Sequence, residues 1–200
     1  MPTAHDHQTL AWYDREAGVY AHRREPSRND RMDAFLARLK PGASILELGC
    51  GGGQDAETMI AAGFDVTPTD GSPGLAAQAQ ERLGRPVRVM RFEALDAVEA
   101  YDAIWASACL LHVPEEALAG ILGRIWRALK PDGLVFASFK AGDGGDRDNL
   151  GRYYNFVSRP ALEAVYAEAG PWSELTLDEM AGGGYDGVPR TWLMVVAAKG

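Results

Sequence analysis

A glycine-rich segment, Glu47–Gln54, has the residue types and spacing that most clearly indicate chemistry, with glycine at positions 49, 51, 52 and 53. Glycine lets the backbone turn sharply and approach a ligand more closely than any residue with a Cβ atom. Asp70 follows Gly51 by 19 residues, a spacing at which a carboxylate can accept hydrogen bonds from both hydroxyls of a ribose. The pattern predicts a site for a nucleotide-like ligand. The alternative is that the glycines only turn the chain and that Asp70 begins a turn with Gly71 and Ser72.

Two residues beside the glycines argue against a dinucleotide cofactor such as NAD. Gln54 stands where the dinucleotide fingerprint has its third glycine. Asp55 would place a negative charge where a pyrophosphate meets the N-terminus of a helix. A nicotinamide-dependent oxidoreductase is nevertheless kept as a rival interpretation, because such enzymes also have an acidic residue that binds the ribose.

Strands and helices that alternate along the chain must position these residues, and this order is typical of a doubly wound, mostly parallel α/β sheet. Ligands of such sheets bind outside the carboxyl ends of the strands, so the strand-to-helix loops should carry function. Pro68 is unexpected in the second strand, where it removes a hydrogen bond to a neighbouring strand. The predicted strands are Ser44–Leu48, Phe64–Thr69, Val87–Met90, Tyr101–Ala106, Leu134–Phe139 and an antiparallel hairpin of Ser173–Met180 with Thr191–Ala198. The predicted helices are Gln8–Arg24, one opened by Ser27, Gln54–Ala62, Pro73–Leu83, Pro114–Lys130 and one from Ser158 to Ala169.

Four segments together resemble motifs of the class I methyltransferases that use S-adenosylmethionine (SAM): Ile45–Gly53, Asp70–Ser72, Tyr101–Ile104 and Leu129–Leu134. The resemblance runs from about Tyr13 to the C-terminus, and the small-molecule and tellurite-resistance-type branches look most similar. It implies a Rossmann-like, three-layer α-β-α fold, with a seven-stranded sheet whose terminal strand is antiparallel. It also implies SAM as the cofactor and S-adenosylhomocysteine (SAH) as the product.

The resemblance assigns the cofactor to the loops that follow the first strands. It implies that the glycines pack under the methionine part of SAM and that Asp70 binds the ribose. Arg91–Leu95 departs from the family pattern, since many relatives carry there an aspartate that contacts the adenine amine. The residues expected at the cofactor are Tyr13, Tyr20, Glu47, Gly49, Cys50, Gly51, Gly53, Asp70, Gly71, Ser72, Phe92, Glu93 and Ser107.

Methyl transfer from a sulfonium is an in-line displacement, so an enzyme has to position the acceptor, exclude water and hold a cation that loses its charge. Aromatic faces on the N-terminal helix, such as Tyr13 and Tyr20, suit that cation, although ordinary helix packing explains them equally well. The predicted catalytic residues are His112, as a general base, and Tyr153. The predicted substrate-binding residues are Lys140, Arg152, Tyr154 and Arg190. Each has an alternative. His112 could be a structural histidine, the loop that carries Arg152, Tyr153 and Tyr154 could be solvated, and Arg190 could be packed half-buried at the start of the last strand.

Composition limits the partners and the compartment. The 200 residues carry a net charge of -8, which argues against nucleic acid or anionic lipid as partners. Two cysteines, a polar N-terminus and no long apolar run indicate a reducing, cytoplasmic setting without a membrane span. His5 and His7 are expected in a disordered tail, and no metal site is expected.

The sequence thus predicts one methyltransferase domain, residues 1–200, acting as a monomer or homodimer. Residues 1–40 should form a helical cap over the cofactor, residues 41–200 the catalytic core, and about 141–155 a flexible lid. We expect SAM-dependent methylation of a small-molecule acceptor of anionic or metalloid type. The rivals are a protein or RNA acceptor, a SAM-binding regulator without turnover and the NAD-dependent oxidoreductase.

Overall fold

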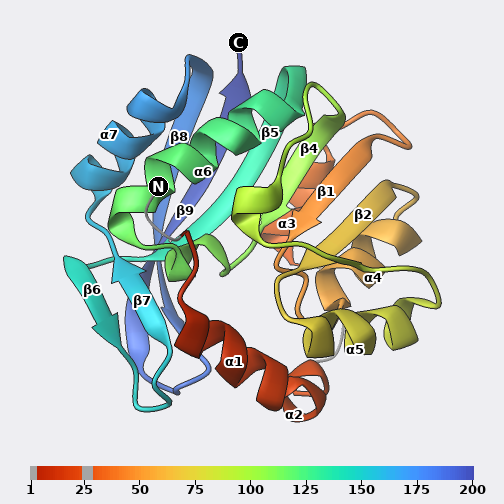
Figure 1. The fold of residues 1–200 in the computed structure, drawn as a ribbon. Coiled ribbons are helices and arrows are strands. Elements are labelled where there is room, and N and C mark those ends of the chain that lie inside the picture. Colours follow the sequence, from red (N-terminus) through yellow and green to blue (C-terminus); the bar gives the residue numbers. More distant parts are fainter. Residues whose placement is uncertain (1–3, 24–28) are drawn as a thin grey trace.

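The computed structural model describes residues 4–23 and 29–200, which fold around one seven-stranded sheet (Figure 1). The strands lie in the order β3-β2-β1-β4-β5-β9-β8. The pairings from β3 to β5 are parallel, whereas β9 runs antiparallel to both β5 and β8. The predicted α/β class, the seven strands and the antiparallel end of the sheet are confirmed.

The bounds of the elements agree closely with the sequence prediction in the core. β1, α5 and β4 have the predicted limits, whereas β5 begins five residues earlier than predicted, because Leu129 already has extended backbone angles and ends α6. The strands are β1 (Ser44–Leu48), β2 (Asp65–Asp70), β3 (Arg88–Val89), β4 (Tyr101–Ala106), β5 (Leu129–Lys140), β6 (Gly144–Arg147), β7 (Tyr153–Phe156), β8 (Trp172–Gly183) and β9 (Pro189–Lys199). The helices are α1 (His7–Arg15), α2 (Ala17–Ala21), α3 (Asp30–Leu36), α4 (Gln54–Ala61), α5 (Pro73–Leu83), α6 (Glu115–Ala128) and α7 (Arg159–Ala169), with short 3-10 turns η1 (Phe92–Ala94) and η2 (Leu110–His112).

Helices cover both faces of the sheet because neighbouring residues of a strand point to opposite faces. On one face, Leu46 and Ile104 pack in the large core with the apolar side of α6. On the other face, Ile45 and Trp105 pack in a second core with α3 and α4. The three layers predicted from the sequence are therefore present (Figure 1).

Pro68 fits in β2 because of the side to which its backbone points. Alternate residues of a strand bond to opposite neighbours: the carbonyl of Thr69 accepts from Cys50 beside β1, and that of Asp70 accepts from Met90 beside β3. Pro68 shares the side of Asp70, but β3 pairs only with Thr69 and Asp70. Within the described chain, the sheet has no strand beside Pro68 on that side, so its missing N–H removes no ladder hydrogen bond.

The N-terminal helices lie across the carboxyl ends of the strands (Figure 1). The predicted single helix is two, since the chain bends at Glu16, and the predicted residues Arg24 and Ser27 lie outside the described ranges. Asp14 Oδ1 accepts hydrogen bonds from the Gly74 N–H (2.7 Å) and the Ser72 hydroxyl (3.0 Å), which joins α1 to the start of α5.

The segment predicted as a flexible lid contains a β-hairpin, β6–β7, beside the main sheet. Arg147 of β6 pairs with Asp6 at 2.8 Å, and the N–H of Tyr153 in β7 donates to Thr9 Oγ1 at 2.8 Å. The hairpin is therefore joined to α1.

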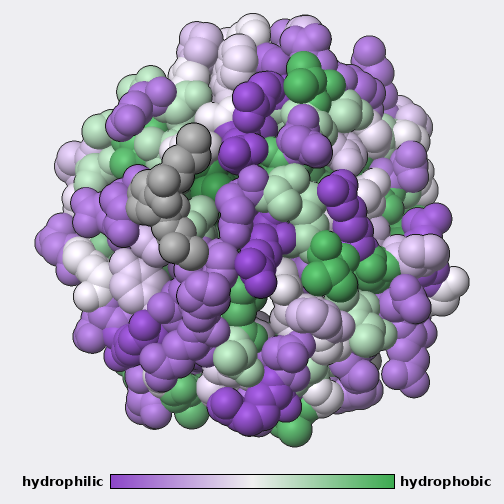
Figure 2. All heavy atoms as spheres, viewed as in Figure 1, coloured by the Kyte–Doolittle hydropathy of each residue, from purple (hydrophilic) through white to green (hydrophobic). Residues whose placement is uncertain are grey.

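Hydrophilic residues dominate the face of the molecule that carries these elements (Figure 2). In the described ranges, no helix has the length and apolar character required to cross a membrane.

Candidate active site

A cavity of about 530 Å³ opens at the carboxyl ends of the parallel strands, beneath α1 and α2. This volume is in the usual range for a pocket that binds a small molecule or cofactor. Most of the residues predicted at the cofactor or the acceptor line it: Tyr13, Tyr20, Glu47, Gly49, Cys50, Gly51, Asp70, Gly71, Phe92, Ser107, His112, Lys140, Arg152 and Tyr154.

Five predicted site residues are not among those that line the cavity. Gly53 begins α4 with φ of +83°, and Ser72 caps α5 by accepting from the N–H of Leu75. The Tyr153 ring is directed toward Gly145 of β6. For these three residues, the structure supports a role in positioning the loops rather than the predicted contact with the cofactor or the acceptor. The other two are Glu93, which binds His5, and Arg190, which binds Asp186.

Two of the glycines after β1 fit only because they lack a side chain. Gly49 has φ of +65°, and a Cβ atom there would lie 2.5 Å from the Cβ of Cys109. Gly52 packs against α2, where a Cβ atom would lie 2.8 Å from the Cα of Ala21. The loop is therefore held tightly between the sheet and the N-terminal helices, and its backbone faces the cavity.

Asp70 ends β2 as a buried carboxylate that organises the glycine loop. Its Oδ2 accepts from the N–H of Gly51 at 2.9 Å and its Oδ1 from the N–H of Ser72 at 2.8 Å. Burial raises the pKa of this carboxyl to about 6, against the backbone hydrogen bonds that lower it. Each carboxylate oxygen can accept a further hydrogen bond. Asp70 both begins the predicted turn and lines the cavity.

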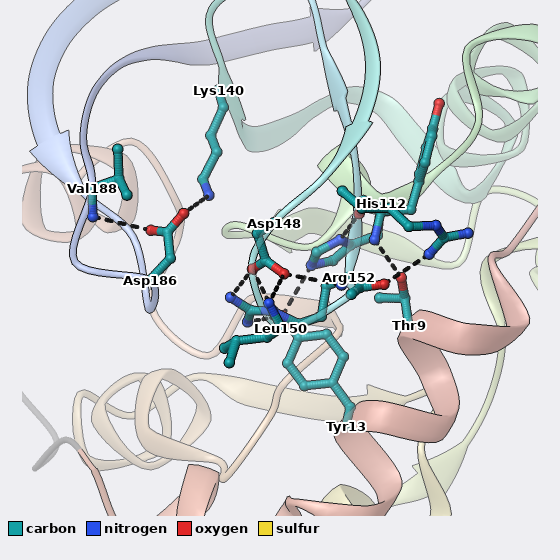
Figure 3. A network of polar contacts seen from close by, with 12 residues as sticks. Thr9, Tyr13, His112, Lys140, Asp148, Leu150, Arg152, Asp186 and Val188 are labelled. Atoms are coloured by element: carbon teal, nitrogen blue, oxygen red, sulfur yellow. Dashed lines mark hydrogen bonds and ion pairs between the residues drawn. The ribbon is translucent and has the colours of Figure 1, made fainter.

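A hydrogen-bond network joins Asp148, Arg152, Tyr13, His112 and the carbonyl of Tyr153 beside the cavity (Figure 3). Arg152 donates to Asp148 from Nε (3.0 Å) and from a terminal nitrogen (2.6 Å), and to the Tyr13 hydroxyl at 3.0 Å. The Tyr13 hydroxyl lies 3.0 Å from His112 Nε2, and His112 Nδ1 lies 2.6 Å from the carbonyl of Tyr153. Since a carbonyl only accepts, Nδ1 carries the proton and Nε2 accepts from Tyr13.

This hydrogen-bond network changes the interpretation of His112. Burial lowers the pKa of its imidazole to about 4, so the ring is neutral at pH 7. Both of its nitrogens are already hydrogen-bonded, which leaves no lone pair directed at an acceptor. The geometry therefore supports His112 as a residue that orients Tyr13, in place of the predicted general base.

Removing the Tyr13 hydroxyl should destabilise the protein, because Arg152 Nη1 and His112 Nε2 each lose the hydrogen bond that they make to it. We expect Tyr13→Phe to lower the free energy of unfolding by about 1–3 kcal/mol. Tyr166→Phe is the matched control, since the buried Tyr166 hydroxyl has no hydrogen-bond partner in the described part of the chain. Thermal unfolding should show a lower midpoint for Tyr13→Phe only. Equal midpoints for the two variants would contradict the hydrogen bonds of the Tyr13 hydroxyl to Arg152 and His112.

Sequence reasoning missed several residues at the site. Asp148 and Asp186 carry the counter-charges of the buried cations, and both come from loops without a recognisable motif. His5 was expected in a disordered tail, but its Nδ1 lies 2.6 Å from Glu93 Oε1 and it lines the cavity. Tyr185, in the loop between β8 and β9, stacks on Tyr20 at 5.3 Å between ring centroids.

Comparisons with known proteins match this arrangement. The family model of a methyltransferase domain matches residues 45–133. The ubiquinone biosynthesis O-methyltransferase of Xanthomonas axonopodis pv. citri (strain 306) is 35% identical over 116 residues, covering 54% of this chain and 48% of that protein. The chain thus spans about half the length of the curated relatives it matches.

Solved structures extend the likeness to the whole chain. The 1,6-didemethyltoxoflavin-N1-methyltransferase of Burkholderia thailandensis, solved with bound 1,6-didemethyltoxoflavin and SAH, has a TM-score of 0.71 and 25% identity, with 100% of this chain and 92% of that chain covered. TehB of Haemophilus influenzae has a TM-score of 0.71 at 17% identity, over 94% of this chain and 67% of that chain, and shows likeness of fold.

The sheet order, the glycine loop and the acidic end of β2 define a Rossmann-like protein with a nucleotide-type site at its switch point. Residues 45–133 match the methyltransferase domain, and the chain is similar to the class I, SAM-dependent methyltransferases in fold and in these features of the site.

Proposed function

We propose that the protein transfers a methyl group from SAM to a small-molecule acceptor. The observation that carries this proposal is a single cavity with two different sides. The glycine loop and Asp70 lie at the ends of β1 and β2, whereas Lys140 ends β5 and Arg152 and Tyr154 belong to the β6–β7 segment. Such an arrangement suits an enzyme that holds a nucleoside cofactor against a second, smaller molecule.

The residues present fit SAM. Gly49 lets the loop pack close against Cys109, and a Cβ at Gly51 would lie 3.5 Å from the Tyr20 ring, so the methionine part fits against the backbone of this loop, with Glu47 beside it. Asp70 can bind the ribose hydroxyls through its remaining lone pairs. Phe92 and Gly71 line the cavity beyond Asp70, where the purine would lie.

SAM supplies an electrophilic methyl group on a sulfonium, and the chain has to align the acceptor and exclude water. Tyr13 and Tyr20 face the cavity from α1 and α2, with ring centroids 5.1 Å apart, and suit the cation. The hydrogen-bond network of Arg152, Tyr13 and His112 fixes one of these rings. No general base is required where the acceptor atom is already deprotonated, because the transfer then leaves no proton to remove.

The proposed acceptor is a small molecule, which the SAH complex of the Burkholderia enzyme with 1,6-didemethyltoxoflavin supports by analogy. We propose Lys140, Arg152 and Tyr154 as the side chains of the acceptor side, with Arg190 acting through Asp186. We also propose a cytoplasmic monomer or homodimer that works without nucleic acid and without a metal. The two cysteines, both unpaired and buried, support a reducing compartment.

Calorimetric titration of the purified protein with SAM, SAH and NADH tests the cofactor. We expect micromolar binding of SAM and SAH and none of NADH. Binding of NADH alone would restore the oxidoreductase, and no binding by a folded protein would overturn the proposal. Formation of SAH from SAM in the presence of pooled small metabolites then separates an enzyme from a regulator, which would bind SAM without turnover.

A further inference from the structure

Lys140 is a cation of the cavity that lacks a close partner. It is the last residue of β5, its side chain is 2% exposed, and it lines the cavity. The nearest carboxylate oxygen is Asp186 Oδ2 at 3.9 Å, too far for a hydrogen bond (Figure 3). Among the described residues, Nζ has no hydrogen-bond partner. Because a buried ammonium without hydrogen bonds is unfavourable, its presence requires an explanation.

Aromatic rings surround this ammonium. Nζ lies 3.6 Å from the centroid of the Tyr154 ring and 5.8 Å from that of Trp192, both of which line the cavity. Burial lowers the pKa of Lys140 to about 8, so the amine is still mostly protonated at pH 7. The rings stabilise a cation without neutralising it. This part of the cavity therefore combines the positive charge of Lys140 with the flat aromatic rings of Tyr154 and Trp192.

Nearby charges leave this side of the cavity with an excess of positive charge. Arg152 is paired with Asp148 through two charged hydrogen bonds, of 3.0 and 2.6 Å. Lys140 and Arg190 share a single carboxylate, Asp186, at 3.9 and 3.6 Å. Within this cluster of described residues, the three cations Lys140, Arg152 and Arg190 therefore share two carboxylates. The carboxylates of Glu47 and Asp70 lie on the opposite, cofactor side of the cavity.

We propose that Lys140 binds the negative charge of a singly charged, flat organic acceptor, such as an aromatic carboxylate or an acidic ring oxygen. The inference rests on the proposed function and names the class of its acceptor. The anion supplies the hydrogen bond that Nζ lacks and balances the third cation, and the ring system of the acceptor packs against Tyr154 and Trp192. Arg152 is not the anchor, because Asp148 and Tyr13 already occupy it.

Benzoate and its neutral isostere benzamide test this inference on the SAH-loaded protein. By calorimetry, we expect benzoate to bind at least tenfold more tightly than benzamide, and Lys140→Met to abolish that preference. Lys130→Met is the charge control, since Lys130 pairs with Asp102 near the amino ends of β5 and β4, away from the cavity. SAH affinity should change less than twofold in both variants.

A second variant keeps Lys140 in place. A Cβ at Gly184 would lie 3.0 Å from Lys140 Nζ and 2.6 Å from Asp186 Oδ1, so Gly184→Ala should displace the ammonium and weaken benzoate binding at least fivefold. Gly183→Ala is the matched control, because a Cβ there has no atom within 4 Å.

The outcomes separate the two proposals. No binding of SAH to the folded wild-type protein contradicts the proposed function. Binding of SAH with no binding of benzoate, or with equal binding of benzoate and benzamide, overturns the acceptor class alone. Retention of the benzoate preference in Lys140→Met overturns the role of Lys140.

Discussion

Replacing Asp70 by alanine is expected to lower the affinity for SAM by about a hundredfold or more. A hydrogen bond to a charged group contributes about 1.5–3 kcal/mol, and two ribose hydroxyls would lose such bonds in the variant. The loop would also lose the carboxylate that holds the N–H of Gly51 and of Ser72. Calorimetric titration with SAM measures the change.

Asp65→Ala is the matched control for this prediction. Asp65 begins the same strand, is exposed and lies away from the cavity, so its loss should leave SAM affinity unchanged. A folded Asp70→Ala protein that binds SAM as tightly as Asp65→Ala would show that the carboxylate does not contact the ribose.

The pH dependence of Asp70 gives a second readout with opposite signs for binding and stability. Its pKa is about 6 in the folded protein, so SAM affinity should be full above pH 7 and fall as the pH drops below 6. Between the unfolded value of 3.8 and about 6, the folded state binds more protons at this group. Its contribution to the stability of the SAM-free protein therefore falls as the pH rises from 4 to 6. Asp70→Ala should remove both effects.

The sheet and the cofactor side could be predicted from the sequence because their signals are local. The apolar run Ser44–Leu48 predicted a strand, and the glycines after it predicted a tight turn wherever they were placed in space. Pro73 and Gly84 bracket α5 with the start and stop signals of a helix. Asp70 was identified from its spacing, 19 residues after Gly51 and at the end of the second strand.

Lys140, Arg152 and Tyr154 were predicted and line the cavity, but the contacts that the N-terminal segment makes at the site could not be predicted in the same way, because they join distant parts of the sequence. Tyr13 meets Arg152 across 139 positions, and His5 meets Glu93 across 88. Neither pair has a spacing signal, since packing of the N-terminal segment on the β6–β7 hairpin and on η1 decides which side chains meet. His112 was predicted from its position after β4, but its protonation depends on Tyr13 and on the carbonyl of Tyr153.

Gly49→Ala is expected to destabilise the fold by roughly 2–5 kcal/mol, because two costs combine at this position. A non-glycine residue at φ of +65° costs roughly 1–2 kcal/mol, and forcing an extra atom into a packed site costs roughly 1–3 kcal/mol. The atom in the way is the Cβ of Cys109, whose thiol donates to the carbonyl of Leu48 and so has little freedom to move.

Gly84→Ala separates these two costs. Gly84 has nearly the same angle, φ of +61°, but a Cβ there meets no atom within 4 Å, so only the cost of about 1–2 kcal/mol for the left-handed conformation applies. Denaturant unfolding should place Gly49→Ala well below Gly84→Ala in stability. Because the clash is with the Cβ of Cys109, the double variant Gly49→Ala/Cys109→Gly should recover stability relative to Gly49→Ala. Equal stabilities of Gly49→Ala and Gly84→Ala would mean that the loop moves aside, and that its close packing against η2 is not required for the fold.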